Sequence, residues 1–132
     1  MSIKQLVPYL NFDGTSHEAI KLYQSALGAK IEGDIMPFDK DPNRVMHARL
    51  TIGSGMVMLS DGPPNMPIPT TSNTHISLDY TDVGEMTKAF ELLAAGGKVT
   101  MPLQDTFWGA HFGMLTDRFH INWMFNCDKP KA

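Results

Sequence analysis

Polar side chains recur at every second residue in two segments of the chain. His75, Ser77 and Asp79 alternate with apolar residues in one segment, and Tyr9 and Asn11 alternate with apolar residues in the other. Side chains two residues apart lie on the same face of a strand. Each segment, as a strand, would therefore present its polar residues on a single face. We expect these faces to contact a small molecule.

A third segment, residues 45–52, adds a histidine and an arginine. His47 and Arg49 share one face, opposite Ala48 and Leu50, which we expect to pack against a helix. A guanidinium binds a carboxylate or phosphonate through paired hydrogen bonds, and an imidazole can act as a general base near neutral pH. Ligand contact is one interpretation. The other is structural, with an ion pair between Arg49 and Asp79 and a hydrogen-bonded histidine.

The segment Gln104 to Gly109 combines polar residues, two aromatic residues and a glycine in an order that does not follow strand alternation. We expect an irregular loop at the edge of the ligand site, from which Phe107 and Trp108 close over an apolar ligand. The alternative is that these rings cap the core or fill a dimer contact. Trp123 and Phe125, which alternate with Met124, are instead predicted to pack in the core beneath a helix.

The elements that carry these residues occur twice in the sequence. The segment from Val7 to Phe12 aligns with that from His75 to Tyr80 at a shift of 68 positions. Each is followed by an amphipathic segment that predicts a helix, at Ser16 to Leu27 and at Asp82 to Ala95. Thr15 or Ser16 is the expected N-cap of the first helix, and Asp82 that of the second.

Three short strands are predicted after each helix. They are Lys30 to Pro37, Val45 to Ile52 and Met56 to Ser60 in the first half, and Lys98 to Leu103, Ala110 to Thr116 and Ile121 to Asn126 in the second. The Pro-rich stretch 62–73 is predicted to be the linker between the halves. The fold class is therefore α+β, with two βαβββ modules, about 1–61 and about 74–128, in a single domain that spans residues 1–132.

Composition excludes several classes of partner. With 11 Lys and Arg against 14 Asp and Glu, and a net charge of -3, the chain lacks the basic patch that nucleic-acid binding requires. Its apolar runs are too short for a transmembrane helix, and its first residues do not resemble a signal peptide. We therefore expect a soluble, cytoplasmic protein that binds neither nucleic acid nor membrane.

The sole cysteine and the remaining histidines are given no part in the expected site. Cys127 cannot form an internal disulfide, and it is interpreted as a reduced structural cysteine instead of a nucleophile. His17, His111 and His120 are expected to be solvated.

The paired βαβββ modules resemble the vicinal oxygen chelate superfamily, which includes glyoxalase I, bleomycin-resistance proteins, fosfomycin-resistance proteins and extradiol dioxygenases. Several motifs look like its PhnB-like branch: Pro8 to Gly14, His47 to Leu50, Met58 to Asp61, Pro102 to Gly109, Thr116 to Phe119 and Trp123 to Asn126. The resemblance implies a glyoxalase-like cup of mixed sheets with helices on its convex face. The ligand would then lie in the concave pocket.

The resemblance also assigns the superfamily's four metal-ligand positions to Val7, Met58, His75 and Met124. Only His75 is of a type that typically binds a divalent metal, and such sites need about three protein ligands. We therefore expect no metal cofactor, with one divalent ion as the alternative. Methionines at such positions are typical of an apolar lining.

The function that follows is metal-independent binding of a small organic molecule, as in bleomycin-resistance proteins. The alternative is a metal-dependent glyoxalase-type, dioxygenase-type or resistance enzyme acting on a small oxygenated substrate. Whether the protein catalyses a reaction is therefore left open. A homodimer is expected, and exchange of modules between its chains stays open. The predicted ligand pocket is lined by His75, His47, Arg49, Tyr9, Met58, Met124, Trp108, Phe107 and Asp79.

Overall fold

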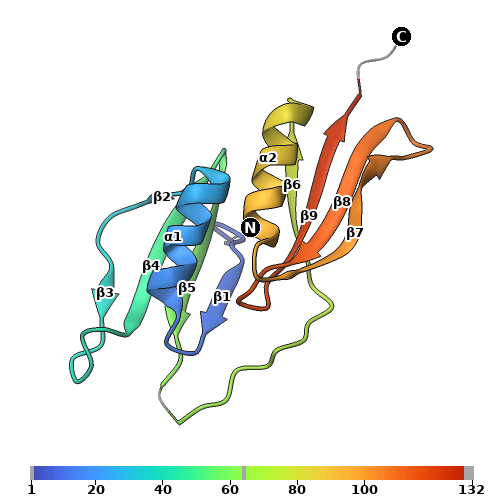
Figure 1. Cartoon of the computed structure of the whole chain (residues 1–132). Coiled ribbons are helices and arrows are strands. Elements are labelled where there is room, and N and C mark those ends of the chain that lie inside the picture. Colours follow the sequence, from blue (N-terminus) through green and yellow to red (C-terminus); the bar gives the residue numbers. More distant parts are fainter. Residues whose placement is uncertain (1, 64, 130–132) are drawn as a thin grey trace. The chain divides into compact units, whose positions relative to one another are not determined.

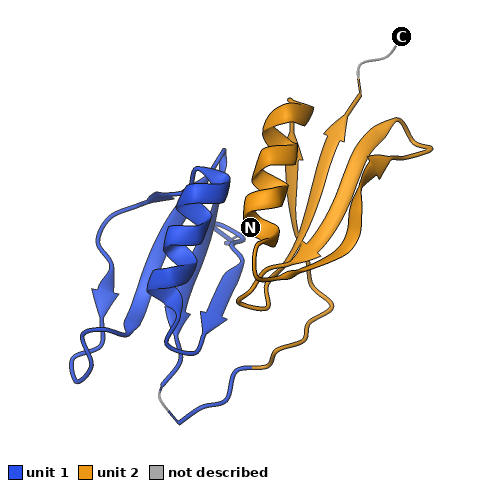
Figure 2. Ribbon diagram, in the orientation of Figure 1, with its two compact units in different colours: residues 1–68 blue, residues 69–132 orange. Residues whose placement is uncertain are grey.

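The structure is a computed structural model, and it describes residues 2–63 and 65–129. The chain divides into two compact units, residues 1–68 (unit 1) and residues 69–132 (unit 2), shown in Figure 2. The boundary lies within the Pro-rich stretch 62–73. No described helix is long and apolar enough to cross a membrane.

Unit 1 places one helix against a five-stranded mixed sheet (Figure 1). Its elements are β1 (Tyr9–Phe12), α1 (Ser16–Leu27), β2 (Lys30–Ile31), β3 (Met36–Pro37), β4 (Val45–Ile52) and β5 (Gly55–Asp61). The strand order is β1-β5-β4-β2, and β3 also pairs with β4. Strand β1 runs parallel to β5, and the other pairs are antiparallel. Helix α1 packs against β4 and β5.

Unit 2 repeats this plan with a four-stranded sheet (Figure 1). Its elements are β6 (Ile76–Tyr80), α2 (Val83–Ala94), β7 (Lys98–Asp105), β8 (Ala110–Thr116) and β9 (Asn122–Asp128). The order is β6-β9-β8-β7, with β6 parallel to β9 and the other pairs antiparallel. The predicted α+β class with two βαβββ modules is therefore confirmed.

Each helix buries an apolar face against its own sheet. In α1 the buried face includes Ala19, Ile20 and Tyr23, and in α2 it includes Met86 and Phe90. The strand residues of the core alternate along the chain: Leu10, Phe12, Ala48, Leu50, Val57 and Leu59 in unit 1, and Leu115, Trp123 and Phe125 in unit 2. Burying one such large apolar side chain contributes about 1.5–3 kcal/mol. The strand residues between these core residues lie on the opposite face of each sheet, here called its open face.

The two helices begin in different ways. Asp82 caps α2 as predicted, because its Oδ2 accepts a hydrogen bond of 2.8 Å from the Glu85 amide. Thr15 is the N-cap residue of α1, one of the two candidates predicted, but its side chain makes no capping hydrogen bond. The buried Asp61 carboxylate at the end of β5 instead accepts from the Ser16 amide and hydroxyl, and from the Val45 amide.

The expected strand from Lys30 to Pro37 is divided in the structure. Only β2 and β3 at its two ends are strands, and both pair with β4. Gly33, between them, has a φ of 73°, in the left-handed region that a strand does not use. The expected strand therefore breaks at this glycine.

Candidate functional site

The open face of unit 1 carries a row of three predicted site residues. Tyr9 on β1 lies opposite Met58 on β5, and Met58 lies opposite Arg49 on β4. Residues paired across strands share a face. Because the adjacent Leu10, Leu59 and Ala48 are buried on the helix side, this row lies on the open face, where Tyr9 is 44% exposed.

His47 extends this face next to the row. It lies two residues before Arg49, and a hydrogen bond of 3.0 Å joins its Nδ1 to Tyr9 Oη. The two rings have centroids 5.8 Å apart. If the Tyr9 hydroxyl donates this hydrogen bond, His47 Nδ1 is the acceptor and the neutral imidazole carries its proton on Nε2. The Nε2–H group is then a further hydrogen-bond donor. The structure therefore joins two of the predicted site residues directly.

The Arg49 side chain is exposed, and no hydrogen bond or ion pair engages its guanidinium within residues 2–63 and 65–129. A Cβ atom built on Gly33 would lie 3.9 Å from Arg49 Nη2, so the guanidinium lies beside this glycine. Asp79, the ion-pair partner in the structural interpretation of Arg49, accepts a hydrogen bond from Asn126 within its own unit. An exposed cation without a partner can bind an anionic group.

The open face of unit 2 carries methionines at its centre. Ser77, Met124, Met114 and Met101 form one row across β6, β9, β8 and β7. All three methionines of the row are partly buried. Thioether side chains are flexible and polarisable, which suits apolar contact with ligands of varied shape.

A polar row flanks the methionines. Asp79, Asn126 and Phe112 lie opposite one another on β6, β9 and β8. Asn126 Nδ2 donates to Asp79 Oδ1 at 2.9 Å and to Asp128 Oδ1 at 3.2 Å. His75 is exposed and immediately precedes β6, and alternation places it on the same face as Ser77.

Phe107 and Trp108 lie in a turn at the end of the β7–β8 hairpin. The strand β7 extends to Asp105, so the expected irregular segment from Gln104 is limited to residues 106–109, here called the aromatic turn. Phe107 is 97% exposed and Trp108 is 56% exposed. Trp108 contacts Phe107 and Phe112 edge-on, with ring centroids 5.0 Å and 5.8 Å apart. Through Phe112 the aromatic contacts reach the open face of unit 2.

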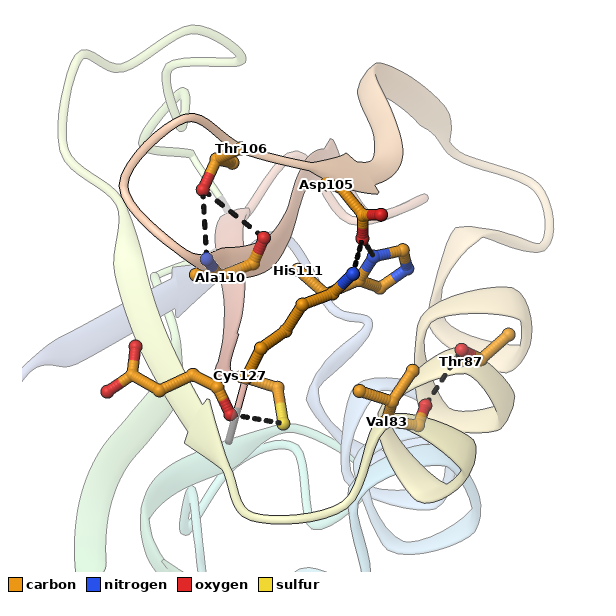
Figure 3. A network of polar contacts seen from close by, with 9 residues as sticks. Val83, Thr87, Asp105, Thr106, Ala110, His111 and Cys127 are labelled. Carbon is orange, nitrogen blue, oxygen red and sulfur yellow. Dashed lines mark hydrogen bonds and ion pairs between the residues drawn. The ribbon is translucent and has the colours of Figure 1, made fainter. Parts of the chain in front are cut away.

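Strand register places Asp105 on β7 opposite His111 on β8, and His111 opposite Cys127 on β9. A carboxylate, an imidazole and a thiol are residue types that can together support nucleophilic catalysis. The thiol does not suit that role. Burial and three nearby carboxylates raise the pKa of Cys127 above its usual value, and its Sγ contacts the Asp128 carbonyl (Figure 3). His111, expected to be solvated, is instead partly buried and contacts Asp105. His120 is exposed as expected, and it has a positive φ of 72°.

The residues at the assigned metal positions do not fit a divalent ion. Val7 has no donor atom in its side chain, and the thioethers of Met58 and Met124 are poor ligands for zinc, nickel, manganese or ferrous iron. His75 alone cannot hold such an ion. Within the described part of the chain, no three His, Cys, Asp or Glu residues form a group that could hold a metal.

Sequence reasoning missed Met101, Met114 and Asn126, which lie beside predicted site residues. Their positions follow from which strands are neighbours and in which register, as in the pairing of Met114 with Met124. The order β6-β9-β8-β7 brings together segments that are separated in the sequence. Alternation within β8 could indicate the face of Met114 but not its neighbour.

Comparisons with known proteins agree on one family. The model of the Glyoxalase/Bleomycin resistance protein/Dioxygenase superfamily matches residues 5–125. Protein YjdN of Escherichia coli K12 is 35% identical, with 96% of this chain and 97% of that protein covered. The crystal structure of protein PA1353 from Pseudomonas aeruginosa is 41% identical, with a TM-score of 0.83 over 97% of this chain and 100% of that one. A Bacillus cereus structure described as a putative 3-demethylubiquinone-9 3-methyltransferase, PhnB protein, has a TM-score of 0.83 at 24% identity, covering 94% and 99% of the two chains.

Proposed function

The chain belongs to the Glyoxalase/Bleomycin resistance protein/Dioxygenase superfamily, and we propose that it binds a small organic molecule without a divalent metal ion. The observation that supports this proposal is the presence of Met58 and Met124 on the open sheet faces, at two of the positions that the resemblance assigns to metal ligands. Methionine favours contact with an apolar group over binding of a hard cation. The PhnB protein of Bacillus cereus offers a precedent for the fold alone.

On unit 1, the proposed contact is with an anionic group. The Arg49 guanidinium, which has no partner among the residues that the structure describes, supplies paired donors for a carboxylate. The His47 imidazole, held by Tyr9, supplies a further donor. Met58 lies between Tyr9 and Arg49 in the cross-strand row and offers apolar contact. This face therefore favours a carboxylate attached to an apolar body.

On unit 2, the proposed contacts are mainly apolar and aromatic. Met124 offers a thioether, and Phe107 and Trp108 offer exposed rings. His75 and Asp79 add polar groups at the edge strand β6. Binding sites commonly combine apolar walls with a few fixed polar groups in this way.

Calorimetric titration with 2-naphthoate tests the proposal, with neutral 2-naphthamide as the matched control. We expect saturable binding of the carboxylate, weaker binding of the amide, and no change when the protein is treated with a chelator. A titration series that also includes benzoate and octanoate covers other apolar bodies. No saturable binding of any of these carboxylates at millimolar concentration would refute the proposal, as would binding that chelation abolishes and zinc or nickel restores.

We also propose that the protein is a homodimer. The strands β1 and β6 each lie at the edge of their sheet and have one neighbouring strand among the described elements. An edge strand offers unpaired backbone groups to a second chain. Light scattering at micromolar concentration should give about twice the chain mass of 14.6 kDa, and a mass equal to that of one chain would contradict the dimer.

A further inference from the structure

We propose that Asp105 is a positioning residue that holds the aromatic turn in a preformed geometry for ligand contact. This inference rests on the proposed function, in which Phe107 and Trp108 contact the ligand. Asp105 itself lies one residue before the turn and is assigned no ligand contact. Its role would be exerted through the turn.

The Asp105 side chain, at the base of the turn, contacts one residue of β8 and one residue of the segment that follows β9. His111 Nδ1 on β8 lies 2.9 Å from Asp105 Oδ1, a contact drawn in Figure 3. Lys129 Nζ, from the residue that follows β9, lies 2.7 Å from the same oxygen. One carboxylate oxygen therefore links the end of β7 to β8 and to the segment after β9.

Further hydrogen bonds fix the backbone of the turn itself. The Thr106 amide donates to the Ala110 carbonyl, and the Thr106 hydroxyl bonds to both the amide and the carbonyl of Ala110 (Figure 3). Gly109 has a φ of 84° and its amide donates to the Thr106 carbonyl, while its own carbonyl accepts from the Lys129 amide. The backbone of the turn and the Asp105 side chain are thus anchored to the same residue, Lys129.

The side chains on this anchored backbone have little packing of their own. Phe107 is almost fully exposed, and Trp108 makes ring contacts with Phe107 and Phe112. Rings that are exposed yet carried on a fixed backbone lose less conformational freedom on binding than rings on a mobile loop. Polar contacts of Asp105 can therefore affect affinity without contacting the ligand.

The charge of Asp105 is part of this arrangement. Hydrogen bonds from Lys129 and His111 lower the pKa of the Asp105 carboxyl below its ordinary value, so the group is ionised at neutral pH. An ionised oxygen makes stronger bonds to cationic donors than a neutral amide oxygen does. Replacing Asp105 by Asn keeps the size of the side chain and removes the charge.

The test compares Asp105→Asn with Asp39→Asn, which alters an exposed carboxylate with no described hydrogen bond or ion pair. Nanosecond anisotropy decay of tryptophan fluorescence measures the motion of Trp108 in the free protein. The contribution of buried Trp123 is taken from the Trp108→Phe variant. Titration with 2-naphthoate measures affinity, and Asp105→Glu tests for rescue by a carboxylate.

We expect Asp105→Asn to increase the fast motion of Trp108 and to weaken 2-naphthoate binding by about 5- to 10-fold. Asp39→Asn should change neither, and Asp105→Glu should restore part of both. Unchanged Trp108 motion in Asp105→Asn, or unchanged affinity despite faster motion, would overturn the inference while the wild type still binds. If the wild type does not bind 2-naphthoate or the other carboxylates, the proposed function fails, whatever the anisotropy shows.

Discussion

Replacement of Arg49 by Gln separates a binding role from a structural role of this arginine. The side chain is exposed, and its guanidinium has no hydrogen bond or ion pair within the described residues. Its loss should therefore change the free energy of unfolding by no more than about 0.5 kcal/mol. A charged hydrogen-bonded contact to a ligand is worth about 1.5–3 kcal/mol, so affinity for 2-naphthoate should fall by about 10- to 150-fold.

Arg44 provides the matched control. Its guanidinium donates to the Gly62 carbonyl and lies 3.6 Å from Asp13, and its side chain is only 14% exposed. Arg44→Gln should therefore lower the free energy of unfolding by about 1–3 kcal/mol, because the Gly62 carbonyl loses a charged donor. It should leave the affinity for 2-naphthoate unchanged.

Calorimetric titration and urea denaturation of both variants give the two free energies. A stability loss in Arg49→Gln equal to that in Arg44→Gln, with unchanged affinity for 2-naphthoate, would refute the assignment of Arg49 to the ligand. Affinity for 2-naphthamide should fall much less in Arg49→Gln, because the amide carries no charge.

Three further variants or measurements follow from the structure. Asp61→Ala removes the acceptor of three hydrogen bonds from Ser16 and Val45, so urea denaturation should show a loss of about 3 kcal/mol or more. His75→Ala should weaken 2-naphthoate binding and change the free energy of unfolding by at most about 0.5 kcal/mol, because His75 is exposed. Burial raises the pKa of Cys127, so iodoacetamide should alkylate this thiol at pH 8 at least about tenfold more slowly than free cysteine. Unfolding in urea should remove the difference in rate. Rapid alkylation of the folded protein would contradict the burial of the thiol.

The fold was predictable where short-range patterns determine it. Both helices lie within two residues of their predicted ends, because apolar residues repeat at helical spacing and glycine follows α1 in the left-handed conformation. Alternation also assigned Ala48 and Leu50 correctly to the buried face of β4, and Trp123 and Phe125 to that of β9. These patterns depend only on near neighbours in the chain.

Features that depend on distant residues were not predictable. The contact between Asp61 and the start of α1 joins residues 45 positions apart, so no pattern in the residues around Thr15 and Ser16 could indicate it. The interaction of His111 with Asp105 depends on the register of the β7–β8 hairpin, which the sequence alone did not fix. The strand break at Gly33 follows from its positive φ, which a glycine permits but does not require.

Metal content tests the central proposal most directly. The measurement is elemental analysis by mass spectrometry of protein purified without a histidine tag, before and after incubation with zinc, nickel, manganese and ferrous iron followed by removal of unbound metal. With methionine at positions 58 and 124, we predict well under one equivalent of each metal per chain. One equivalent of any of these divalent ions retained per chain would contradict metal-independent binding.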